Sequence, residues 1–176
     1  MRLKLRGTYT LEVAQSADVV RRRLQHEITE DWFVFAAIRN RSRFWGYVEA
    51  EKMKLRYTGC RKDTPLVKRN DFSPAFHGTI HETAGKTVLH FRWRISIFLI
   101  AFMTVWFAVA GFGFFLCLLD TDFDAILMTG GMLLGGFALP MWGVLSGVKD
   151  TKAALRETVV MPGEWWREYE REDQEI

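Results

Sequence analysis

The sequence predicts an α+β protein: an N-terminal antiparallel β-rich domain with one amphipathic helix, then a two-helix transmembrane hairpin and a short helical C-terminal tail. Two observations predict this fold class. Residues 1–94 contain runs in which polar and apolar residues alternate, a pattern typical of strands with one buried face. Two long uncharged runs follow, at 95–119 and 125–148. We therefore expect a cytoplasmic domain over 1–94, a transmembrane hairpin over 95–148, and a cytoplasmic helix and charged tail over 149–176.

The uncharged runs are 25 and 24 residues long. As a helix, either run is about 36 Å long, and the hydrocarbon core of a bilayer is about 30 Å thick, so each run can cross it with some tilt. An Asp or Lys in mid-membrane would disfavour insertion by about 2.5–3.5 kcal/mol, and neither run contains one. The alternative is a buried helical hairpin in a soluble protein, which rarely needs so long an uncharged run. Both runs lie in the second half of the chain, which argues against a signal peptide.

The distribution of charge predicts the orientation of the hairpin. Residues 1–94 hold 19 basic and 10 acidic residues, a net charge of +9, while the link 120–124 and the segment 149–176 each carry −3, which gives the total of +3. Bases close to the membrane remain in the cytoplasm. They flank the hairpin on its outer sides and are absent from the link; they are Arg92, Arg94, Lys149, Lys152 and Arg156. Both termini are therefore expected in the cytoplasm.

Several elements are expected within the first domain. Alternation predicts a strand over 2–12, and Ser16 can cap a helix that runs to about Ile28. Two further strands are expected at 44–50 and 52–58, and a weaker one at 66–72.

A β-hairpin is the clearest local element of this domain. Residues 75–82 and 86–94 flank a turn at Ala84-Gly85, where glycine readily supplies a positive φ. If Thr83 pairs with Lys86, one face of the hairpin is apolar and the other is largely polar, which supports this register. The predicted pairs are Ile80 with Leu89, Gly78 with Phe91, Phe76 with Trp93, His81 with Val88, Thr79 with His90 and His77 with Arg92.

The polar face of this hairpin carries a candidate metal site made of His77, His81 and His90. Zinc accepts three histidine ligands and a water molecule, and a membrane-bound metal-dependent enzyme could be built on such a site. The alternatives are a sheet surface that faces solvent or membrane and happens to carry histidines, and a pH-responsive surface. No acid or cysteine completes the set.

Two groups of arginines are candidates for contact with anionic lipid headgroups. The first is Arg21, Arg22 and Arg23 on the expected helix, which is otherwise a solvated face, and the second is Arg92 and Arg94 before the first span. Nucleic acid is not an expected partner, because a position beside the membrane explains the basic charge more simply.

Small residues recur in the second span, as Gly131, Gly135, Gly143 and Gly147. Such spacing lets helices approach closely. The partner is either the first span, at Ala101, Ala108 and Gly111, or another subunit of a homo- or hetero-oligomer. Pro140 should kink the span, because proline removes one backbone donor.

Other classes of function have little support. The phosphate-binding, dinucleotide-binding and hydrolase motifs are absent, no cofactor is expected, and no catalytic residue can be chosen. Neither span holds an ionisable residue, so a proton relay within this chain is not expected. Cys60 and Cys117 form no CxxC pair, which fits a reducing compartment. Trp165 and Trp166, after the turn at 161–163, either dock on the β domain or enter the membrane interface.

Part of the chain, from Phe44 to Val148, resembles a set of uncharacterised small bacterial two-span membrane proteins with an N-terminal β-rich domain. The shared pattern is Phe44-Trp-Gly46, Arg56, Asn70-Asp71-Phe72, Gly78-Thr-Ile80 and Gly85-Lys-Thr87. The resemblance implies a bacterial inner-membrane setting, and it carries over no activity and no functional residue. The leading hypothesis is a non-enzymatic, membrane-anchored interaction module. The alternatives are an accessory subunit of a transporter and the metal-dependent enzyme.

Overall fold

A computed structural model describes residues 6–29, 42–59, 70, 72–120 and 123–169. Within them the fold is α+β, with one seven-stranded sheet in the order β2-β3-β4-β5-β6-β1-β7 and three helices. The elements are β1 (Arg6–Val13), α1 (Ala17–His26), β2 (Ile28–Thr29), β3 (Phe44–Val48), β4 (Lys52–Tyr57), β5 (Phe76–Thr83), β6 (Lys86–Arg94), α3 (Ile97–Asp120), α4 (Phe123–Val159) and β7 (Trp166–Tyr169).

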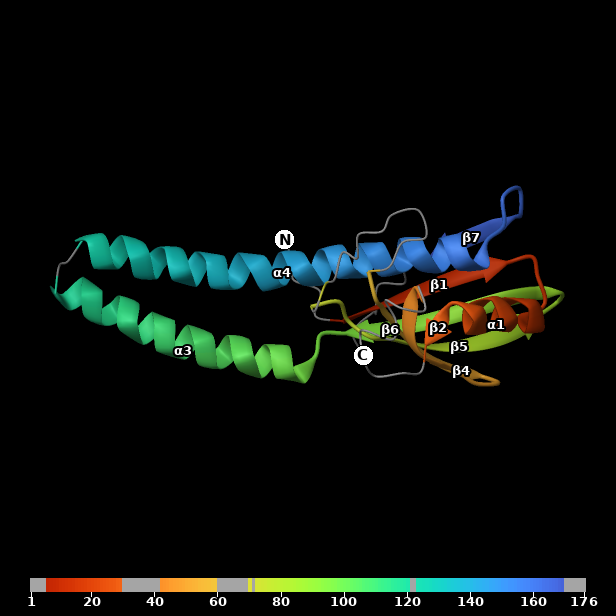
Figure 1. Cartoon of the computed structure of the whole chain (residues 1–176), viewed down its shortest axis with the longest axis horizontal. Helices are drawn as coiled ribbons and strands as arrows, with labels where there is room; N and C mark the ends of the chain where they lie inside the picture. The colour runs from red at the N-terminus through yellow and green to blue at the C-terminus, as the bar shows by residue number, and fades with distance from the viewer. Residues whose placement is uncertain (1–5, 30–41, 60–69, 71, 121–122, 170–176) are drawn as a thin grey trace.

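The molecule is elongated, with the helical hairpin at one end and the sheet at the other (Figure 1). Helix α3 follows β6 after only Ile95 and Ser96, so the sheet leads into the hairpin without a linker. Helix α4 returns beside α3 and then continues over the sheet. The strands β5 and β6 lie roughly along the direction of the two long helices.

One hydrophobic core joins the sheet, α1 and the second half of α4. Helix α1 contributes Val20 and Leu24, and every buried residue of α4 lies at or after Pro140. The strands contribute alternate residues, because successive side chains point to opposite faces of a sheet. Those that are buried and apolar are Tyr9, Leu11, Val13, Phe44, Met53, Leu55, Phe76, Ile80, Leu89, Phe91 and Trp93.

The predicted β5–β6 hairpin is confirmed in every pair. Thr83 pairs with Lys86, and the register continues to Phe76 and Trp93. The two turn residues, Ala84 and Gly85, have φ values of 50° and 75°. Positive φ at both central positions matches the right-handed twist of the flanking strands.

Most other elements of this domain lie close to the predicted positions. The strand expected at 2–12 is β1 from Arg6 on, and residues 2–5 lie outside the described part. Ser16 is the N-cap residue of α1, but this helix ends at His26, and Ile28 already belongs to β2. The strands expected at 44–50 and 52–58 are β3 and β4. The strand expected at 66–72 lies almost wholly outside the described residues; Asn70 and Phe72, which are described, are not in a strand.

The C-terminal part differs from the prediction. The second uncharged run and the helix expected after it form one helix, α4, which continues through Pro140 to Val159. The charged tail expected after this helix, either helical or frayed, is neither at residues 166–169, which form β7 on the edge of the sheet against β1. A turn at Pro162-Gly163, with Gly163 at φ 85°, ends α4 and reverses the chain. Residues after Tyr169 lie outside the described part.

Gly46 in β3 should be indispensable to the sheet. It has φ 143°, and a Cβ atom added there would lie 1.8 Å from the carbonyl oxygen of Lys54 on β4. We expect Gly46→Ala to lower the free energy of unfolding by about 3 kcal/mol, because the pairing of β3 with β4 must shift. Gly85→Asn is the matched control, since asparagine tolerates positive φ and nothing lies within 4 Å of the added atom. Thermal unfolding of the two variants in detergent measures the difference, and equal midpoints would contradict it.

Candidate functional site

The sheet has one face covered by helices and one open face, and the open face is the candidate site. On β6, Thr87, Leu89, Phe91 and Trp93 are buried, while the residues between them are at least partly exposed. Both α1 and the second half of α4 contribute to the single core on the buried side. Among the described residues, no helix packs on the opposite side of the sheet.

The strand register gathers basic residues on this open face. One row across the sheet contains Tyr47, Lys54, His77, Arg92 and Thr8, from five neighbouring strands. Arg6 pairs with Arg94 at the end of the sheet that adjoins α3. The basic side chains on this face are Arg6, Lys52, Lys54, Arg56, Lys86, Arg92, Arg94 and Arg167, whereas Glu12 is the only acid that the register of the described strands places on it. We call this set the basic face.

His77 lies on the basic face beside two positive charges, those of Lys54 and Arg94. Partial burial, followed by the charges of Lys54 and Arg94, holds the pKa of His77 below its ordinary value of 6.5. A neighbouring positive charge disfavours the imidazolium form, as desolvation does. The potential at this point is therefore positive, and an anion that approaches it would be attracted.

The three histidines proposed as metal ligands are not brought together. His77 and His81 lie four positions apart on β5, which corresponds to about 13 Å along a strand. His90 on β6 shares a hydrogen bond of 2.8 Å between its Nδ1 and the hydroxyl oxygen of Thr10. Among the described residues, no three side chains of His, Cys, Asp or Glu gather in a way that could hold a metal ion. The arrangement favours a polar sheet surface that carries histidines.

Two of the arginines on α1 have intramolecular partners. Arg21 forms an ion pair with Asp18 at 2.7 Å and donates to the carbonyl oxygen of Ala50 at 2.7 Å. Arg23 donates to the carbonyl oxygen of Val159 at 2.9 Å, at the C-terminal end of α4, where a cation is favoured. Val159 lies 15 residues beyond Val144, which is about 22 Å along the helix. The cluster Arg21–Arg23 thus lies far from the apolar hairpin, which argues against its predicted contact with headgroups.

Arg92 and Arg94, the other arginines expected at the headgroup level, are exposed at the end of β6 that leads into α3. Their position is compatible with that expectation.

The glycines of α4 divide into three groups. Gly136 lies against the indole of Trp106 and Gly130 against the ring of Phe114, both on α3. Close contact with α3 therefore occurs at these two aromatic residues, and a Cβ atom added at the predicted partner Gly111 would meet nothing within 4 Å. The same is true of Gly131 and Gly135, whose surroundings are open.

Gly143 and Gly147 pack on the β domain rather than on α3. A Cβ atom at Gly143 would lie 2.7 Å from the ring of Phe72, and one at Gly147 would lie 2.7 Å from the Cα atom of Ser73. Asn70 donates from its side-chain amide to the carbonyl oxygen of Gly143 at 2.6 Å. Sequence reasoning missed this contact, although both glycines lie near the end of the uncharged run, where α4 leaves the apolar segment.

Trp165 and Trp166 lie at the edge of the sheet. The backbone carbonyl of Trp165 accepts a hydrogen bond from the amide of Ala14, and Lys86 Nζ lies 4.4 Å from the centroid of its ring. The guanidinium of Arg156 lies 5.4 Å from the ring of Trp166. The indole of Trp165 therefore contacts β6, and that of Trp166 contacts α4. Of the two hypotheses for these tryptophans, this arrangement favours docking on the β domain over entry into the membrane interface.

Comparison with known proteins identifies no family that matches the chain, no similar curated protein and no similar solved structure. The resemblance to small bacterial two-span proteins therefore stays a prediction.

The pKa of His77 should respond to its neighbours. We expect Lys54→Gln, and to a smaller extent Arg94→Gln, to raise the pKa of His77 towards 6.5, whereas Arg22→Gln on α1 should leave it unchanged. Because the folded-state pKa is lowered, the unfolded chain binds the proton more readily. Stability should therefore decrease as the pH falls through 6.5, and His77→Gln should remove this part of the decrease. Titration of ring-labelled histidine by NMR measures the pKa, and a value for His77 above 6.5 would contradict the account.

Proposed function

We propose that the chain is a membrane-anchored interaction module, in which α3 and α4 cross a bilayer and the sheet domain binds an acidic partner protein in the cytoplasm. The two helices are long and apolar enough to cross a membrane. In their most apolar segments, 0% of the residues of α3 and 6% of those of α4 are buried. The core helix of a soluble protein would be mostly buried instead. Ile97 and Phe98, for example, are 84% and 78% exposed. Apolar surface on this scale is typical of contact with lipid or other subunits.

The orientation follows from charge. The link between the helices carries three aspartates and no base, whereas Arg92, Arg94 and Lys149 flank the hairpin on its other side. The positive-inside rule then favours a cytoplasmic β domain with both termini in the cytoplasm. The resemblance to small bacterial two-span proteins favours the inner membrane.

The observation that carries the proposal is the direction of the basic face. Helix α4 is one continuous helix of 37 residues whose first half lies in the apolar hairpin and whose second half is part of the domain core. The strands β5 and β6 run roughly along this helix (Figure 1). If the hairpin crosses the bilayer, the plane of the sheet stands on the membrane and the basic face points sideways. A face in that position cannot lie flat on headgroups, but it is open to an acidic macromolecule in the cytoplasm.

A second candidate function is an accessory subunit of a larger membrane assembly, such as a transporter or a homo-oligomer. One observation favours it: the surroundings of Gly131 and Gly135 are open, and a small-residue face on α4 could admit a helix of another subunit. This candidate requires a contact within the membrane, whereas the leading one requires a contact at the basic face.

The topology can be tested by cysteine labelling. We expect Asp120→Cys, in a chain whose native cysteines are replaced by serine, to react with an impermeant maleimide in intact cells. Lys86→Cys, at the start of β6 beside the β5–β6 turn, should react only after the membrane is opened, because the positive-inside rule places the β domain in the cytoplasm. If Lys86→Cys is labelled in intact cells and Asp120→Cys is not, the orientation is the reverse of the proposed one, and the proposal is contradicted.

Binding at the basic face can be tested by charge reversal. We expect the double variant Lys54→Glu and Arg92→Glu to reduce crosslinking to an acidic partner in native membranes by about tenfold or more, since like charges across an interface disfavour it. Arg22→Glu, exposed on α1, is the control for a charge reversal away from this face, and it is compared with the single variant Lys54→Glu, which has the same charge change. The captured partner should be released by salt. Equal capture by both variants would contradict binding at this face and favour a contact within the membrane.

A further inference from the structure

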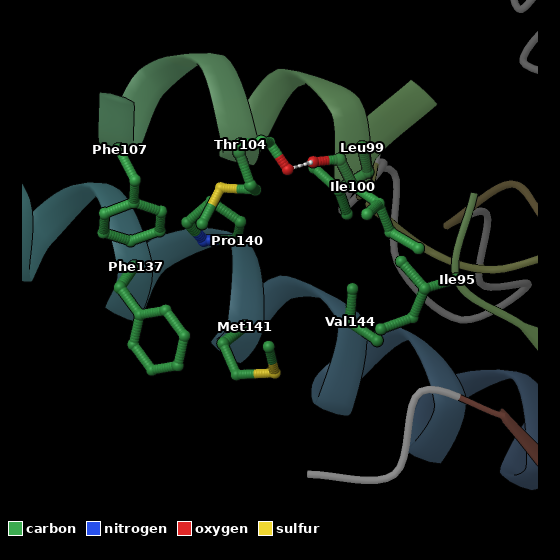
Figure 2. A pocket seen from close by; sticks show the side chains of 10 residues that line it. Ile95, Leu99, Ile100, Thr104, Phe107, Phe137, Pro140, Met141 and Val144 are labelled. Atoms are coloured by element: carbon green, nitrogen blue, oxygen red, sulfur yellow. Dashed lines mark hydrogen bonds between the residues drawn. The ribbon is translucent and has the colours of Figure 1, made fainter. Parts of the chain in front are cut away.

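An apolar groove opens where α3 and α4 separate next to the sheet (Figure 2). It has a volume of about 220 Å³ and is lined by Ile95, Leu99 and Phe107 on the side of α3, and by Phe137, Pro140 and Val144 on α4. Among the described residues that line it, Thr104 is the one with a polar side chain, and its hydroxyl donates to the carbonyl oxygen of Ile100 at 2.9 Å. A groove without free polar groups offers water no partner, so its natural occupant is hydrocarbon.

The groove is a consequence of how the hairpin joins the sheet. Helix α3 continues from β6, which belongs to the sheet, whereas α4 lies on the face of the same sheet, so the two helices must separate where the sheet begins. Ile95 and Val144 are buried in the common core at this end. At the other end the rings of Phe107 and Phe137 meet, with centroids 6.1 Å apart, and close the groove.

The length and level of the groove fit one leaflet of a bilayer. The lining runs from Ile95, just before α3, to Phe107, and the ten residues from the start of α3 at Ile97 to Phe107 correspond to about 15 Å along the helix. The hydrocarbon of one leaflet is about 15 Å thick, half of the bilayer core. Ile100, between the two ends, is 43% exposed, so the groove is open to the side where lipid would lie.

Two arginines lie at the end of the sheet that leads into α3, next in sequence to the groove residue Ile95. Arg94 immediately precedes Ile95, and Arg6 lies directly opposite Arg94 in the β1–β6 pairing. Both side chains are exposed, and neither has an ion pair within the described residues. Like charges directly opposite each other in a sheet are unfavourable. An anionic group between them would relieve this repulsion.

We propose that the groove binds one acyl chain of an anionic phospholipid from the cytoplasmic leaflet, and that Arg94 and Arg6 contact its phosphate. The apolar lining selects a hydrocarbon chain, and the arginine pair selects a negatively charged headgroup. The site would hold one lipid per chain in a fixed position, between the anchor and the domain. It rests on the membrane placement of the hairpin and is independent of the acidic partner.

The test measures lipid retained by the full chain after extraction from vesicles that contain equal amounts of phosphatidylglycerol and phosphatidylcholine. Native mass spectrometry should detect one retained phosphatidylglycerol per chain. Leu99→Phe, which fills the groove, should lose it, whereas Leu134→Phe, at a position that is 75% exposed on α4, should retain it. Arg94→Gln and Arg6→Gln should each reduce the preference for phosphatidylglycerol roughly fivefold, as expected for one basic residue at an anionic surface. Arg22→Gln should leave the preference unchanged.

Several outcomes would overturn the proposal. Retention of phosphatidylglycerol by Leu99→Phe at the level of the unmodified chain would exclude the groove as its site. An unchanged preference in Arg94→Gln and Arg6→Gln would exclude the arginine pair, and these surface variants decide the question even if Leu99→Phe does not fold. A change of oligomeric state in Leu99→Phe, without loss of lipid, would identify a second copy as the occupant. Flotation of each variant with vesicles reports membrane insertion separately, so a failure of the anchor is distinguishable from a failure of the site.

Discussion

The contact of Gly143 and Gly147 with the segment that contains Phe72 and Ser73 lets one helix serve both halves of the molecule. Without side chains at these two positions, α4 approaches the β domain closely enough for Asn70 to bond to its backbone. The same helix then supplies Val148, Leu155 and other residues to the domain core. The hairpin and the sheet are consequently joined twice, by α4 packing on the sheet and by the direct passage from β6 to α3. Both the direction of the basic face and the separation of the helices at the groove depend on this double connection.

The sequence was most informative where structure is local. In the β5–β6 hairpin, a two-residue turn and the alternation of apolar residues determine the register, and every predicted pair is present. The two apolar runs likewise predict α3 and the first half of α4. The C-terminal strand β7 was not predictable in this way, because its four residues are exposed and its position depends on pairing with β1, more than 150 residues earlier. The second span was expected to run through Pro140 to Val148 with a helix after it, but the sequence did not reveal that the two form one helix whose second half belongs to the domain core.

The candidate site was predictable only in part, for the same physical reason. The excess of positive charge in residues 1–94 was evident, and His77 and Arg92 were assigned to one face of the hairpin. The addition of Lys54 and Arg6 to that face requires the long-range pairings of β4 with β5 and of β1 with β6. Conversely, Arg21 to Arg23 looked like a free basic cluster, since their acceptors, the backbone carbonyls of Ala50 and Val159, leave no signal in the sequence.

The pairing of charges separates the two sides of the sheet. On the helical side, acidic residues of α4 and of the segment after it lie beside bases of the N-terminal half: Arg43 pairs with Glu157 at 3.1 Å, and Arg23 lies 3.8 Å from Glu164. On the basic face, Arg6, Arg92 and Arg94 have no such partner within the described residues, and their mutual repulsion is retained. Repulsion of this kind lowers the stability of the domain, and an anion bound at this face would reduce it. The ion pairs between distant segments that the described residues form thus lie on the helical side of the sheet, whereas the basic face keeps its excess of positive charge.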